Sequence, residues 1–196
     1  MHSLRPGALW LALLIALAVP HEASADGHEP KTTTTTTTTE PDPQPTPEET
    51  RKVLADIREY RRETRRLRRL MGKRLPAVRP ARAAFASRHE YRLRLRRIWR
   101  LRLAETRRAF RRPPHLKAWR CIHRYEGSWK DPDPIYYGGL QMDLTFQRTY
   151  GRELLRRKGT ADNWTPLEQM WVGERALRAG RGFYPWPVAA RRCGLI

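Results

Sequence analysis

The sequence predicts a mainly α-helical protein in which a basic helical hairpin or coiled coil precedes a small C-terminal domain. That domain is expected to be α-helical with minor β structure. The first observation is a heptad-like apolar spacing within residues 48–111. The second is a series of capped amphipathic segments within residues 115–196. The third is that this last segment holds five of the seven tryptophans, namely Trp119, Trp129, Trp164, Trp171 and Trp186. A core and a carbohydrate-sized cleft are therefore expected there.

The N-terminal region has the pattern of an export signal followed by a tether. Residues 1–25 contain an apolar run at 8–20 and the small residues ASA at 23–25, which are typical of a cleaved signal peptide. An uncleaved N-terminal anchor is the alternative, and it too would place the rest of the chain outside. No later apolar stretch is long enough to cross a membrane, so no transmembrane segment is expected after cleavage. Residues 26–47, rich in threonine and proline, are predicted to be a disordered linker.

The charge indicates a class of partner, and the cysteines indicate a disulfide. The formal net charge of +20 predicts a polyanionic partner such as nucleic acid, anionic lipid or an acidic wall polymer. Export argues against nucleic acid. An oxidising compartment also favours a disulfide between Cys121 and Cys193, the only two cysteines of the chain. Free or metal-bound thiols are the alternative, but no histidine stands at ligand spacing.

The basic segment at 48–111 is expected to form two helices. Four- and three-residue spacings join Val53, Ile57, Tyr60, Thr64, Leu67 and Met71. The prolines of LPAVRP at 75–80 end this first helix. A second apolar stripe follows, made of Tyr91, Leu95 and Ile98, with Trp99, Leu101 and Leu103 nearby. Two roles remain open for the hairpin: a solubilising spacer or coiled coil, or an element that attracts anionic wall polymers or lipid head groups.

The C-terminal segment is expected to contain three helices. The first covers about 115–126 and stops at Gly127, and the second covers about 143–159. The third begins at a capping box formed by Thr165 and Glu168, and Gly180 follows its end. The irregular stretch between the first two helices contains DPDP at 131–134 and two glycines.

Glu126 is the candidate for acid chemistry. It lies at the end of a predicted helix, where the dipole disfavours negative charge, and aromatic residues adjoin it. Both effects would raise its pKa and keep a proton available for a glycosidic oxygen. Arg124 and the other arginines would act in the opposite direction, and the sequence leaves this balance open.

The order of motifs around Glu126 resembles a known family. Trp119, Glu126, Trp129, the YYGGLQ segment at 136–141, the EQ pair at 168–169 and the WPVAARRC segment at 186–193 follow one another as in the resuscitation-promoting factor catalytic domain. That domain is a small lysozyme-like relative of the lytic transglycosylases. The resemblance covers residues 115–196. It departs from the family where Tyr125 replaces a cysteine and where the loop after Glu126 is shortened to EGSW.

The resemblance implies roles for individual residues. Glu126 would be the general acid and then the base, and no metal or cofactor is implied. Residues implied to bind substrate are Trp129, Tyr137, Gly139, Gln141, Gln169 and Trp186. Taken alone, Trp186 and Tyr137 are also compatible with a core position, and Gly139 with a turn.

A hydrolase usually requires a second carboxylate. Asp143 is the nearest candidate, but a helix N-cap is the favoured interpretation, and Asp131 and Asp133 are further options. Since none of these is convincing, the single-carboxylate route of the lytic transglycosylases is favoured over hydrolysis.

The expected function is therefore that of a secreted, cell-wall-associated bacterial enzyme. Its substrate would be peptidoglycan, cleaved at the β-1,4 bond between N-acetylmuramic acid and N-acetylglucosamine. One alternative is a non-catalytic wall-binding module of the same fold. Another is a basic exported adhesin or structural protein in which the helical segment is the functional part.

Overall fold

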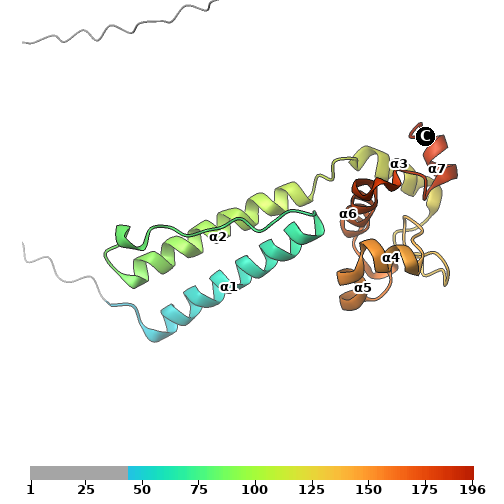
Figure 1. Cartoon of the computed structure of the whole chain (residues 1–196). Coiled ribbons are helices and arrows are strands. Elements are labelled where there is room, and N and C mark those ends of the chain that lie inside the picture. Colours follow the sequence, from blue (N-terminus) through green and yellow to red (C-terminus); the bar gives the residue numbers. More distant parts are fainter. Residues whose placement is uncertain (1–43) are drawn as a thin grey trace, which may run out of the picture. The chain divides into compact units, whose positions relative to one another are not determined.

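The computed structural model describes residues 44–196, which contain seven α-helices (Figure 1). The signal peptide predicted for 1–25 and all but the last residues of the linker predicted for 26–47 lie outside the described residues. Mainly α-helical structure is confirmed for the described part. The helices are α1 (Pro47–Leu70), α2 (Arg88–Phe110), α3 (Leu116–Glu126), α4 (Leu144–Tyr150), α5 (Arg152–Lys158), α6 (Pro166–Ala176) and α7 (Pro187–Arg192).

Helices α1 and α2 pack against each other as the predicted hairpin (Figure 1). A capping box between Thr46 and Glu49 begins α1, and Ser87 caps α2 by accepting a hydrogen bond from the Glu90 amide at 3.0 Å. The predicted α1 stripe faces inward, with four of its six members buried: Val53, Thr64, Leu67 and Met71. On α2, Trp99 and Leu103 are buried, whereas Leu101 is 56% exposed. Leu101 is therefore a surface residue.

The C-terminal helices enclose a core built around tryptophan. Trp119 and Ile122 of α3 are fully buried, as are Trp164 and Val172. Trp119 donates its indole N–H to Glu174 at 2.9 Å, so this buried carboxylate has a partner inside the core. The predicted disulfide between Cys121 and Cys193 is present and joins α3 to the residue after α7.

Three details differ from the sequence prediction. The helix expected over 143–159 is two helices, α4 and α5, because the chain breaks at Gly151, against which the Trp164 ring packs. The helix expected up to Gly180 ends at Ala176 and continues as a π-helical turn. The short helix α7 was not expected. Minor β structure is limited, within residues 44–196, to one antiparallel bridge between Tyr137 and Met142.

The core continues from the C-terminal helices into the hairpin. Leu70 and Met71, at the end of α1, belong to the same buried cluster as Trp119. The Phe110 ring stacks on Trp171 of α6, with ring centroids 6.1 Å apart. The Trp171 indole N–H also donates to the Phe110 carbonyl at 2.7 Å. The described residues, 44–196, accordingly form one compact unit.

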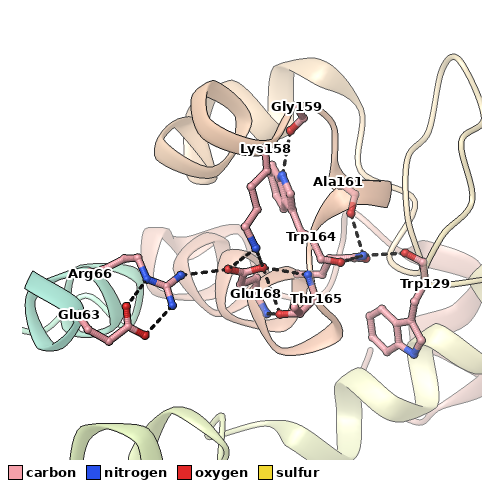
Figure 2. A network of polar contacts seen from close by, with 10 residues as sticks. Glu63, Arg66, Trp129, Lys158, Gly159, Ala161, Trp164, Thr165 and Glu168 are labelled. Carbon is pink, nitrogen blue, oxygen red and sulfur yellow. Dashed lines mark hydrogen bonds and ion pairs between the residues drawn. The ribbon is translucent and has the colours of Figure 1, made fainter. Parts of the chain in front are cut away.

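An ion network also joins α1 to α6 (Figure 2). Glu168, buried in the first turn of α6, accepts hydrogen bonds from Lys158 at 2.7 Å and from Arg66 of α1 at 3.2 Å. Burial alone would raise the pKa of Glu168, but the hydrogen bonds from Lys158 and Thr165 lower it below its ordinary value. Arg66 is held in turn by Glu63 at 2.8 Å. Glu168, the glutamate of the EQ motif, thus joins α6 to α1 and α5.

Candidate active site

Glu126 is the last residue of α3 and lies at the edge of its buried face. It follows Ile122 by four residues and Trp119 by seven, so all three share one side of the helix. Gly127 ends the helix with φ at 136°, a conformation that favours glycine, and the chain turns away there. This position leaves the Glu126 side chain half-buried.

The carboxylate of Glu126 has no hydrogen-bond or ion-pair partner among residues 44–196. Its burial raises its pKa above the ordinary value for glutamate, because the charged form is poorly solvated there. The balance that the sequence left open therefore falls on the side of a raised pKa, and burial is its cause. The neighbouring Tyr125 is exposed and lies under Arg192 of α7, whose guanidinium carbon is 5.2 Å from the ring centroid.

The loop from Gly127 to Met142 lies beside Glu126 and is held through its own backbone. Four side chains from other segments bind its carbonyl groups. Gln169 donates to Trp129 O at 2.9 Å, Trp186 to Leu140 O at 2.6 Å, and Gln147 to Met142 O at 2.7 Å. His123 Nδ1 lies 3.2 Å from Gly139 O and donates there when that nitrogen carries the proton. Each such bond contributes on the order of 1 kcal/mol, so the loop is well fixed.

Two predicted substrate-binding residues occupy supporting positions instead. Gln169 is fully buried, and its amide also donates to Ala161 O at 2.9 Å. Figure 2 shows this group of bonds next to Trp129. Trp186 is buried between Trp119 and Phe146. A ligand would reach neither side chain, so both are corrected to supports of the loop and the core.

Gly139 is also buried, and its role is to permit close packing. A Cβ at this position would lie 2.6 Å from His123 Nδ1 and 2.7 Å from the Trp129 ring. The backbone at 139 therefore contacts the aromatic pair directly, and only glycine fits. This packing places Gly139 beneath the loop surface, not at a sugar-contacting position.

The remaining predicted residues stay partly exposed on the loop. Trp129 stacks on His123 with ring centroids 3.8 Å apart, and Tyr137 donates its hydroxyl to Pro134 O at 3.0 Å. Gln141 has a φ of 44°, which is unusual for a residue with a side chain. Its amide donates to Asp131 at 2.9 Å and to Gly138 O at 3.1 Å. Asp131 Oδ2 and the Gln141 amide lie within 3.5 Å of a Cβ built on Gly127, next to Glu126.

None of the aspartates proposed as a second carboxylate is free of local bonds. Asp143 caps α4 and accepts a hydrogen bond from the Phe146 amide at 2.6 Å, in agreement with the N-cap interpretation. Asp133 accepts hydrogen bonds from the amides of Tyr136 and Ile135, and these lower its pKa. Asp131 is bonded to Gln141.

His123 is a site residue that the sequence analysis missed. It precedes Glu126 by three residues, so both lie on the same side of α3. Helical spacing from Glu126 was the signal that could have identified it. No three His, Cys, Asp or Glu side chains within residues 44–196 are grouped as metal ligands. In the same range, no helix combines the length and the apolar character needed to cross a membrane.

No known family model, curated protein or solved structure matches the chain. The assignment of a function to this site therefore depends on its geometry and chemistry.

Proposed function

We propose that this chain is an exported peptidoglycan-cleaving enzyme with a lysozyme-like domain over residues 115–196. It would cleave the β-1,4 bond between N-acetylmuramic acid and N-acetylglucosamine at the cell wall. The main support is Glu126, whose half-buried carboxyl group has no partner among residues 44–196 and a raised pKa. A general acid of this reaction needs a carboxyl group whose raised pKa keeps its proton near neutral pH.

In the proposed reaction Glu126 acts twice. Its protonated form donates the proton to the glycosidic oxygen as the bond to C1 of the muramic acid breaks. The resulting carboxylate then takes the proton from the nucleophile that attacks C1. In a lytic transglycosylase this nucleophile is the 6-hydroxyl of the same sugar, and the product ends in a 1,6-anhydro ring. In a hydrolase it is water.

The surroundings of Glu126 favour the transglycosylase route. Asp143 and Asp133 are engaged as hydrogen-bond acceptors for backbone amides, and Asp131 holds the Gln141 amide. Each of these aspartates already holds a local hydrogen bond, so none stands out as the base that would activate water. The intramolecular attack needs only the single acid and base that Glu126 provides.

Three partly exposed loop residues are the proposed sugar contacts. Trp129 offers an aromatic surface, Tyr137 its hydroxyl group and Gln141 its side-chain amide. The stacking on His123 and the bond from Gln169 to the Trp129 carbonyl fix where Trp129 can sit. The proposed site omits Gly139, Gln169 and Trp186 as direct contacts because they are buried.

The test is the product mixture formed from purified peptidoglycan by the mature protein and by Glu126→Gln. We expect 1,6-anhydro muropeptides from the mature protein and a loss of about 10²-fold or more in their rate of formation for the variant, since a general acid contributes about 10²–10⁴-fold. Mass spectrometry identifies the products. Glu59→Gln, the same change at an exposed position of α1, is the control and is expected to keep full activity.

Other outcomes of this experiment have clear meanings. Products with reducing ends would replace transglycosylation by hydrolysis and return attention to Asp131. Folded, disulfide-bonded protein that gives no product dependent on Glu126 would overturn the enzyme proposal and favour the wall-binding module.

The raised pKa of Glu126 also predicts a pH-dependent stability difference. Between the unfolded and the folded pKa, the folded state binds more protons, so stability falls as pH rises through this window. The variant Glu126→Gln lacks this titration. We expect its melting temperature to equal that of the parent below about pH 4, under both pKa values, and to exceed it at neutral pH. Calorimetry at both pH values measures the difference. A parent protein more stable than the variant at neutral pH would contradict the prediction.

A further inference from the structure

The positive charge of the chain is concentrated in the hairpin. Residues 48–111 contain 23 of the 40 Lys and Arg residues but only 7 of the 20 Asp and Glu residues, a net charge of +16. Residues 112–196 contain 15 basic and 8 acidic residues, a net charge of +7. The site at Glu126 thus lies on the less charged part, and the hairpin charge calls for an explanation of its own.

Helix α2 carries a large share of this charge, and most of its arginines are unpaired. It contains nine arginines and no lysine between Arg88 and Phe110. Among the described residues, only Arg96 and Arg102 of α2 form ion pairs, with Asp56 at 3.6 Å and with Glu105 at 3.1 Å. Arginine differs from lysine in its planar fork of donors, which matches the oxygens of phosphate groups. Unpaired exposed guanidinium groups on one helix are therefore suited to a phosphate-bearing partner.

Two open hollows lie next to each other along the exposed arginines of α2. They have volumes of about 500 and 430 Å³, and both are lined by Leu93 and Arg97. Arg94 and Phe85 complete the first hollow, and Arg100 and Tyr60 the second. Each hollow is therefore lined by apolar or aromatic side chains together with guanidinium groups.

The acidic residues at these hollows are already engaged. Glu90 accepts a hydrogen bond from the Ala86 amide at 2.9 Å, and Asp56 pairs with Arg96. In contrast, the exposed Arg94, Arg97 and Arg100 have no ion pair among the described residues. They follow one another at three-residue intervals, so their backbones span about 9 Å along the helix.

We propose that the α2 row of Arg94, Arg97 and Arg100, with its two hollows, binds a linear phosphodiester polymer attached to the cell wall. Successive phosphate groups would pair with successive guanidinium groups, and the backbone between phosphates would lie over Leu93. The Cys121–Cys193 disulfide fits an oxidising compartment outside the cytosol, where such polymers occur and nucleic acid is uncommon. On α2 only Leu101 is a large exposed apolar residue, which argues against a lipid surface as the partner.

The test measures co-sedimentation with cell walls in the Glu126→Gln background, so that no wall is digested. Walls are used intact or after hydrofluoric acid, which removes phosphodiester polymers and leaves peptidoglycan. One variant changes Arg94, Arg97 and Arg100 to Gln. The matched control changes Arg58, Arg62 and Arg65, three exposed arginines of α1 that also lack ion pairs among residues 44–196, to Gln.

We expect intact walls to bind the α2 variant roughly tenfold more weakly than the parent, because three phosphate contacts are lost. The α1 control is expected to lose less than about threefold, reflecting only the lower overall charge. Stripped walls should bind the parent as weakly as intact walls bind the α2 variant. Circular dichroism checks that both triple variants keep the helical content of the parent.

Several results would overturn this proposal. Equal losses for the two triple variants would mean attraction by net charge alone. Undiminished binding of the parent to stripped walls would assign the partner to peptidoglycan itself. Stronger binding to duplex DNA than to intact walls at the same salt concentration would indicate a nucleic-acid surface. Because the measurement uses catalytically impaired protein, its outcome is separate from that of the proposed glycan cleavage.

Discussion

A protein consisting of residues 115–196 alone is expected not to fold, although the site at Glu126 lies wholly within it. Removing the hairpin takes Leu70, Met71 and Phe110 away from the shared core. Leu70 and Met71 are buried and Phe110 is partly buried, and truncating a buried side chain typically costs about 2–5 kcal/mol. The loss of all three approaches the whole stability of a small domain, about 5–15 kcal/mol. Removal also deletes Arg66, one of the two cations that bind the buried Glu168.

Far-ultraviolet circular dichroism and amide dispersion in NMR spectra would compare the oxidised 115–196 segment with residues 44–196. A matched pair of point variants locates the effect. Met71→Ala, inside the shared core, is expected to lower the melting temperature and expose the core tryptophans. Val53→Ala, buried near the start of α1 and outside that core cluster, is expected to be milder. A cooperative, native-like 115–196 segment would show that the hairpin is dispensable for folding.

Replacing both Cys121 and Cys193 by serine is expected to lower the free energy of unfolding by roughly 4 kcal/mol. The disulfide joins residues separated by 72 positions, and closing a loop of this length removes much of the entropy of the unfolded chain. Nearly all of the segment after Cys121 lies inside this loop. The disulfide also keeps α3, and therefore Glu126, next to α7.

Urea unfolding of the parent and of the double variant, followed by tryptophan fluorescence, measures this difference. Parent protein kept in a reducing agent is the control, and it should unfold at the same urea concentration as the variant. A difference below about 1 kcal/mol would contradict the prediction. It would mean that residual structure already restricts the unfolded chain, which reduces the effect of a cross-link.

The sequence was informative where a feature depends on near neighbours. The capping box at Thr165, the N-cap role of Asp143 and the end of α3 at Gly127 follow from local spacing, and the structure contains all three. The pairing of Cys121 with Cys193 needed only the count of cysteines and an oxidising compartment. For the pKa of Glu126 the sequence offered opposing effects and left their balance open, and burial raises it in the structure.

Features that depend on long-range packing could not be predicted. Gln169 and Trp186 bind loop carbonyls that are 40 and 46 positions away in the sequence, and no local pattern marks such bonds. The ring that packs against Gly151 at the division between α4 and α5 belongs to Trp164, thirteen residues later. The predicted domain boundary before residue 115 was based on the prolines at 113 and 114. In the structure the buried core extends past this boundary and includes Met71 at the end of α1.

The way the loop from Gly127 to Met142 is held has a consequence for how the protein can change. All four supporting bonds end on main-chain oxygens, which every amino acid possesses. The path of the loop is therefore largely independent of the side chains that point outward from it, such as Ile135 and Tyr136, which are 63% and 50% exposed. Substitutions there can alter what the loop touches while its backbone stays in place. The outward surface of the loop can thus change in the course of evolution while the backbone beside Glu126 is preserved.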